Sequence, residues 1–146
     1  MINELERLCR LLREHVRRDS LRAEVRAMRE RMRRELSKAG AGEFDLKQDP
    51  GGIADIEFLA QYWALRWAAE RPPVAWFPDT IRQLESVGSA GLVPQETVDG
   101  LVHAYRMYRE CVHHRAIAGQ SAVVPATQFV PERARVEAAW NAAMQV

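Results

Sequence analysis

The sequence predicts an all-α protein, a bundle of about six helices around a central apolar helix at about residues 53–70. Three observations indicate this class. Apolar residues recur at spacings of three and four along successive segments, glycine or proline clusters separate these segments, and no segment alternates for long enough to build a sheet. The chain of 146 residues has no internal repeat. Residues 1–146 are therefore expected to form a single helical domain with its own core.

The first two helices are expected over residues 2–18 and 21–38. In the first, the apolar stripe consists of Ile2, Leu5, Cys9, Leu12 and Val16. In the second, it consists of Leu21, Val25, Met28, Met32 and Leu36. Arginines of the second helix alternate with acids at i, i+4, a pattern typical of a helix face in solvent.

Proline and glycine mark the limits of the remaining helices. The central helix follows Pro50-Gly51-Gly52 and ends at Arg71-Pro72-Pro73, since proline cannot continue a helix interior. Asp79 is expected to cap a short fourth helix, and a longer fifth helix covers about residues 94–117. A last helix has Pro131 in its first turn.

The composition is that of an ordinary globular protein and excludes several function classes. Hydrophobic residues make up 47% of the chain and charged residues 28%. No apolar run approaches the length of a membrane span, and the N-terminus lacks the apolar stretch of a signal peptide. We therefore expect a cytoplasmic protein with no membrane partner. Cys9 and Cys111 show no metal-binding spacing and are expected to be reduced thiols.

The net charge of +1 hides an uneven distribution. Residues 1–40 contain twelve basic and seven acidic residues, a balance of +5, whereas the remainder contains nine basic and thirteen acidic residues, a balance of −4. Such a split can indicate a nucleic-acid surface or a helix that docks on an acidic part of the same protein. Because the arginines lie among acids, without interleaved aromatic residues for base stacking, we expect no nucleic-acid partner.

Candidate functional residues gather between residues 44 and 62, where a polar connector meets the central helix. A Gly-Gly pair ahead of a helix leaves N–H groups that can bind an anion, and a lysine four residues earlier is near enough to join such a site. The same pair alone is more often a simple turn. Six candidates lie in this run: Lys47, Gly51, Gly52, Asp55, Glu57 and Gln61.

Helix geometry separates the two carboxylates of this run. Successive helical residues are about 100° apart, so Glu57 lies about 200° from Asp55. The two cannot form a paired-carboxylate or metal site on this helix alone. Glu57 shares a face with Gln61 and is expected to be partly buried against an arginine or a backbone donor, as a structural tie or a functional group. Asp55 lies in the first turn, where the helix dipole favours an acid.

The run resembles the signature of the bifunctional glutamine synthetase adenylyltransferase/adenylyl-removing enzymes. The resemblance covers about residues 20–146 and leaves residues 1–18 outside it. It includes the basic second helix and the helix that contains residues 101–114. The matching signature residues are Phe44, Asp45, Leu46, Lys47, Gly51, Gly52, Asp55, Ile56, Glu57, Phe58, Gln61 and Tyr62.

The resemblance implies a place in a larger multidomain enzyme of nitrogen metabolism. Such enzymes contain two nucleotidyltransferase halves, one that removes AMP from glutamine synthetase and one that transfers AMP from ATP to its tyrosine. The chain is similar to the C-terminal helical domain of the adenylylating half. The implied partners are glutamine synthetase, the PII signal protein and the preceding nucleotidyltransferase domain, and the implied cofactors of the intact enzyme are ATP and Mg²⁺.

One departure from the family is informative. The nucleotidyltransferase signature, Gly-Ser followed by spaced aspartates, is absent, because Gly88-Ser89 is followed by Ala90-Gly91. We therefore expect no catalytic residue, no metal site and no bound cofactor in this fragment alone, which should be inactive by itself. His113 and His114 are adjacent and diverge, so they supply no chelating pair.

Two hypotheses remain. In the first, the domain completes the nucleotide cleft: Lys47 contacts phosphate, Gly51 and Gly52 allow backbone approach, and Asp55, Glu57 and Gln61 line or brace the cleft. In the second, it is a non-catalytic interaction module that docks glutamine synthetase, PII or neighbouring domains, with the arginine-rich second helix as its docking face.

Overall fold

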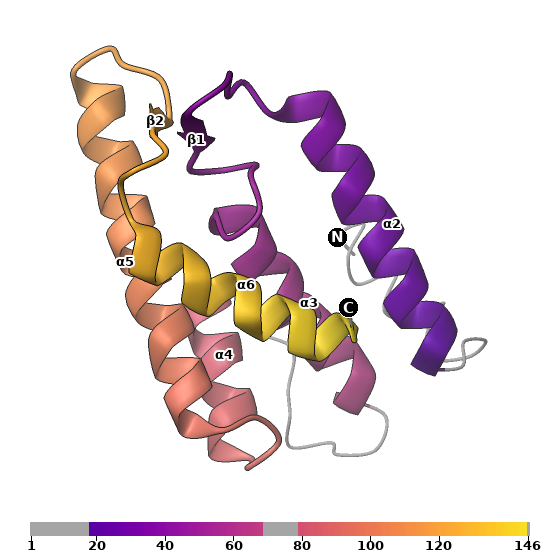
Figure 1. The fold of residues 1–146 in the computed structure, drawn as a ribbon. Helices are drawn as coiled ribbons and strands as arrows, with labels where there is room; N and C mark the ends of the chain where they lie inside the picture. The colour runs from indigo at the N-terminus through magenta and orange to yellow at the C-terminus, as the bar shows by residue number, and fades with distance from the viewer. Residues whose placement is uncertain (1–17, 69–78, 146) are drawn as a thin grey trace, which may run out of the picture.

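The computed structural model describes residues 18–68 and 79–145, which form five helices and one small sheet (Figure 1). This confirms the predicted all-α class and the second to sixth expected helices. Residues 1–17, and with them the predicted first helix and Cys9, lie outside the described residues, as does the Arg71-Pro72-Pro73 stop signal. The elements are α2 (Arg18–Leu36), β1 (Glu43–Asp45), α3 (Ile53–Ala68), α4 (Thr80–Ser89), α5 (Gln95–Ile117), β2 (Val123–Pro125) and α6 (Val130–Met144).

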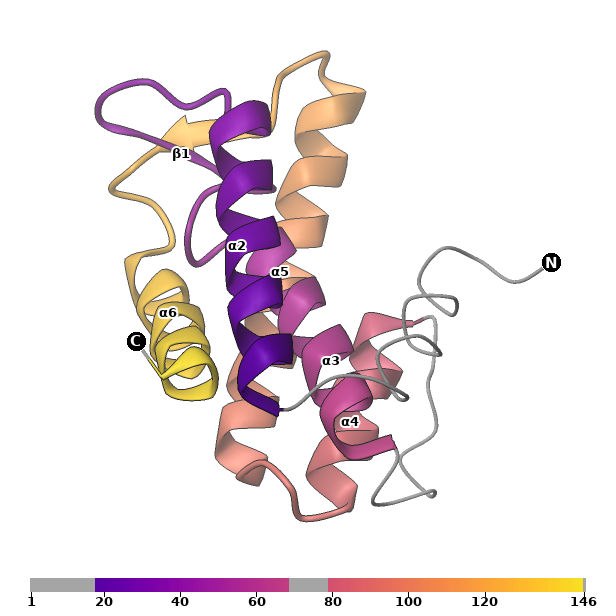
Figure 2. The same cartoon turned by 90° about the vertical axis from the view of Figure 1, so that its right-hand side faces the viewer.

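The central position predicted for α3 is confirmed. It packs against α2, α4, α5 and α6, and in Figure 2 it lies between α2 and the α4–α5 pair. Its inward residues Ile56, Leu59 and Ala60 are fully buried. A helix that contacts four neighbours needs apolar residues on several sides, which accounts for the apolar composition of this segment.

The short sheet was not expected. β1 and β2 pair antiparallel, with Phe44 opposite Val124, and both side chains are buried. Each strand has only three residues, too few for an alternating pattern to be recognised. The pair joins the connector before α3 to the connector before α6, and therefore fixes the candidate run relative to the C-terminal helix.

Helix boundaries follow the predicted signals where they can be tested. Asp79 caps α4 by accepting a hydrogen bond from the Arg82 N–H at 3.0 Å, and Pro131 lies in the first turn of α6. No helix among the described residues combines the length and apolar character needed to cross a bilayer.

The predicted apolar stripe of α2 is partly wrong. Leu21 is buried, but Met28 and Leu36 are 42% and 50% exposed. Arg29 takes the inward position instead and is only 3% exposed. Its burial has an electrostatic reason, because α3 presents a buried carboxylate that requires a cationic partner. Most of the other charged residues of α2, among them Arg26, Glu30 and Arg34, are in solvent as predicted.

Candidate functional site

The connector before α3 is shaped by two aspartates. Buried Asp45 accepts hydrogen bonds at Oδ1 from the N–H groups of Lys47 (2.9 Å) and Gln48 (3.2 Å), and at Oδ2 from the Lys38 N–H (3.0 Å). Asp49 accepts from the Asp45 N–H at 2.9 Å. These carboxylates satisfy backbone donors that a tight turn leaves without partners, so the path of residues 45–50 is well defined.

The two glycines allow backbone segments to pack closely. Gly51 has φ +85°, and a Cβ there would lie 3.0 Å from the Arg133 carbonyl oxygen. A Cβ on Gly52 would lie 2.6 Å from the Leu46 carbonyl oxygen, closer than Cβ atoms approach. Both positions therefore require glycine for packing, independently of any ligand.

The N–H groups at the start of α3 are already occupied. Gly51 donates to Asp55 Oδ2 at 2.8 Å. The next three donate to carbonyl oxygens: Gly52 to Asp49 (2.9 Å), Ile53 to Leu46 (2.8 Å) and Ala54 to Lys47 (3.0 Å). The anion site considered from the sequence called for free donors here, and these four are used within the chain. A nucleotide-binding role of Gly51 and Gly52 stays a prediction.

Asp55 forms a buried ion pair with Arg29. Arg29 Nε lies 2.7 Å from Asp55 Oδ1, and both side chains are almost fully buried. Arg29 also donates through Nη2 to the Gln48 carbonyl oxygen. Burial raises the pKa of Asp55, while Arg29 and the Gly51 N–H lower it in part. The pair ties α2 to the glycine turn and to α3, which is more than the dipole effect considered from the sequence.

Sequence reasoning missed Arg29. Eleven arginines crowd the first 40 residues, and residue type alone assigns all of them to solvent. Arg29 lies four residues after Val25 and eight after Leu21, so it continues their face. This helical spacing, together with an acid in the first turn of the next helix, could have predicted that Arg29 is buried in an ion pair.

Glu57 lies on the opposite side of α3, as helix geometry predicted. It is half-buried, and burial raises its pKa, while Arg109 of α5 and a hydrogen bond from Tyr105 lower it in part. Burial also raises the pKa of Tyr105, which a hydrogen bond with Thr80 lowers in part. Glu57 therefore has the arginine neighbour and the partial burial expected of it.

The six candidates thus fall into three places. The turn and the Arg29 pair bring Gly51, Gly52 and Asp55 together, whereas Glu57 and Gln61 lie half-buried on the other face of α3. The side chain of Lys47 is exposed, and only its backbone joins the turn. Across residues 18–68 and 79–145, no group of three or more His, Cys, Asp or Glu side chains could hold a metal ion.

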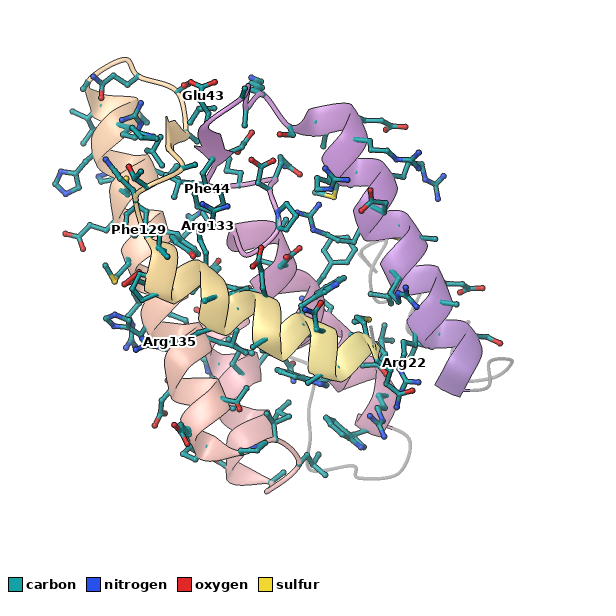
Figure 3. The ribbon with its side chains drawn as sticks, in the orientation of Figure 1. Arg22, Glu43, Phe44, Phe129, Arg133 and Arg135 are labelled. Carbon is teal, nitrogen blue, oxygen red and sulfur yellow. The ribbon has the colours of Figure 1, made fainter. Side chains whose placement is uncertain are left out.

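The start of α6 is held against this turn. Figure 3 shows Arg133 beside Phe44, with its guanidinium carbon 4.0 Å from the ring centroid. Arg133 Nη1 donates to the Ala126 carbonyl oxygen at 3.0 Å. Phe129, in the left-handed region at φ 59°, packs edge-on against Tyr108, with ring centroids 5.4 Å apart. The glycine turn is therefore supported by α6 as well as by α2.

Comparisons with known proteins identify relatives of the chain. The family described as GlnD PII-uridylyltransferase matches residues 19–120. A bifunctional glutamine synthetase adenylyltransferase/adenylyl-removing enzyme of Thioalkalivibrio sulfidiphilus is 43% identical over 128 residues, 88% of this chain. An enzyme of the same name from Nitrosococcus oceani is 44% identical over 125 residues, 86% of this chain. The chain spans 13% of the length of each of these two relatives.

Proposed function

We propose a role for this chain from one premise: it belongs to the GlnD PII-uridylyltransferase family, whose match covers residues 19–120. The chain acts as the helical domain beside a nucleotidyltransferase domain in a longer protein, which transfers AMP from ATP to a tyrosine of glutamine synthetase. The observation that carries this proposal is the 43–44% identity to two enzymes named for that activity. The metal-binding aspartates, and with them Mg²⁺, belong to the other domain, and this chain closes over the ATP bound there.

The turn at residues 47–52 supports a positioning role. It is fixed by Asp45, by the Arg29–Asp55 pair and by Arg133 of α6, and it carries one exposed cation, Lys47. A lysine on a rigid turn can neutralise phosphate charge with little loss of conformational entropy. We assign phosphate contact to Lys47 and bracing roles to Asp55, Glu57 and Gln61.

The test is Lys47→Ala in the full-length enzyme. We expect AMP transfer to glutamine synthetase to fall on the order of tenfold or more, the usual result of losing a charged contact to phosphate. Lys38→Ala is the matched control, because Lys38 is also exposed, lies two residues after α2 and is held beside the same turn by its N–H bond to Asp45. Equal transfer rates in both variants, with normal folding, would remove Lys47 from the site.

A second candidate, the interaction module, is favoured by the outer face of α2. Met28 and Leu36 are 42% and 50% exposed there, beside exposed arginines, and exposed apolar residues of this size suit a protein contact. Replacing both with serine should then weaken binding to glutamine synthetase or PII. Ile117→Ser, at a 74% exposed residue of α5, is the control. Unchanged binding of the double variant would reject this role for α2.

A further inference from the structure

A hollow of about 770 Å³ lies between α2 and α6. The two helices approach one another where Arg22 donates to the Ala143 carbonyl oxygen at 3.1 Å, and they diverge from there (Figures 1 and 3). Ala23 and Ala27 form part of the α2 wall and are too short to fill the gap. The volume lies in the range of about 300–1,000 Å³ typical of small-molecule sites.

The α2 wall of the hollow is cationic. Arg26, Arg29 and Arg33 line it, at the spacing that places helical residues on one face. The carboxylates beside them are largely neutralised, because Arg29 pairs with Asp55 and Arg33 pairs with Glu30. Among the described residues, no ion pair or hydrogen bond engages Arg26. Guanidinium groups in this arrangement suit a phosphate.

Arg29 adds an independent observation. Its Nη1 atom is buried and has no hydrogen-bond partner among the described residues, although Nε and Nη2 are both engaged. Buried guanidinium nitrogens are normally satisfied, and an unpaired one calls for an explanation. Because Arg29 lines the hollow, an anion bound there would lie beside this incompletely satisfied guanidinium.

The α6 wall has a different chemistry. Trp140 lies half-buried there, with Glu137 and Asn141 close to it on the same face. An indole offers a stacking surface to a planar base. A carboxylate and an amide can bond the amino group and ring nitrogens of such a base. Glu137, the only carboxylate of the hollow without an arginine partner in the described part of the chain, thus lies on the same wall as Trp140.

We propose that this hollow binds a nucleoside phosphate, with the phosphate on Arg26 and Arg29 and the base against Trp140. The site is separate from the turn at residues 47–52, since Lys47 does not line the hollow. It also revises the expectation that the chain alone binds no nucleotide. If Lys47→Ala left AMP transfer unchanged, this inference about the hollow would still stand. If the hollow failed to bind AMP, the role proposed for Lys47 would still stand.

The test titrates AMP, adenosine and inorganic phosphate into the 146-residue chain, monitored by calorimetry and by the indole N–H resonance of Trp140, assigned with Trp140→Phe. We expect AMP to bind more tightly than either adenosine or phosphate and to shift the Trp140 resonance. Arg26→Ala should weaken AMP binding about tenfold or more, and Asn141→Ala should weaken it less.

Arg31→Ala is the matched control, because Arg31 is an exposed arginine of the same helix outside the hollow. Binding that is equally weakened in Arg31→Ala and Arg26→Ala would overturn the proposal, as would phosphate that binds as tightly as AMP. An acidic peptide that shifts Trp140 when AMP does not would assign the hollow to a protein segment instead.

Discussion

The two faces of α3 carry carboxylates two residues apart that are held in opposite ways. On the α2 face, Asp55 is 4% exposed and bonded to Arg29 and to the Gly51 N–H. On the α5 face, Glu57 is half-buried, with Tyr105 and Arg109 as its neighbours. The comparison separates a closed structural tie from a group that water can still reach. Only the second can change partners at low cost.

The largest expected loss of stability comes from breaking the Arg29–Asp55 pair on the α2 face of α3, called the closed face below. Arg29→Ala leaves Asp55 as a buried charge without its partner, which costs about 3–5 kcal/mol in comparable cases. Urea unfolding at pH 7 should show this loss, while Arg109→Ala, at an exposed arginine, should change the unfolding free energy by less than about 1 kcal/mol. Equal effects of the two variants would abolish the distinction between the faces.

The pH dependence sharpens the same prediction. Burial raises the pKa of Asp55 above its ordinary 3.8, so this group favours folding below that pH and the benefit is lost as pH rises through the raised pKa. Without Arg29 the pKa rises further. The loss of unfolding free energy caused by Arg29→Ala should therefore be smaller at pH 5 than at pH 8. Adding Asp55→Asn to this variant should recover part of the lost stability. A pH-independent deficit would contradict the charge explanation.

The next effect concerns the glycine turn on the closed face. Gly52→Ala places a Cβ 2.6 Å from the Leu46 carbonyl oxygen, and overpacking against backbone costs about 1–3 kcal/mol. Gly100→Ala is the opposite control, because a Cβ there would lie 3.7 Å from Arg135 Cδ, an ordinary contact. In a helix such as α5, alanine is more favourable than glycine by about 0.8–1 kcal/mol. Thermal melts should thus move in opposite directions. A Gly52→Ala protein as stable as the parent would show that the turn is not rigid.

The sequence predicted the features that depend on periodicity and end signals. Five helices, the central place of α3 and the opposite faces of Asp55 and Glu57 all follow from local patterns along one segment. Residue type predicted the wrong burial for Arg29, which is buried, and for Met28 and Leu36, which are exposed. The burial of Arg29 depends on a partner 26 residues away along the chain. The β1–β2 pair was missed for the same reason, since three described helices, α3, α4 and α5, separate its two strands along the chain.

The smallest expected effect is on the open face and tests whether Glu57 is held by its charge. Burial raises the pKa of Glu57 above its ordinary 4.5, so its contribution also favours folding at low pH and declines as pH rises through the raised pKa. Glu57→Gln removes this titration but keeps an oxygen that can accept from the Tyr105 hydroxyl. Because the side chain is partly in solvent, the change at pH 7 should stay below about 1 kcal/mol. Urea unfolding between pH 4 and pH 8 should show a flatter profile for Glu57→Gln than for the parent. A loss comparable to that of Arg29→Ala would mean that the Glu57 carboxylate is as tightly held as Asp55, and both faces of α3 would then be structural ties.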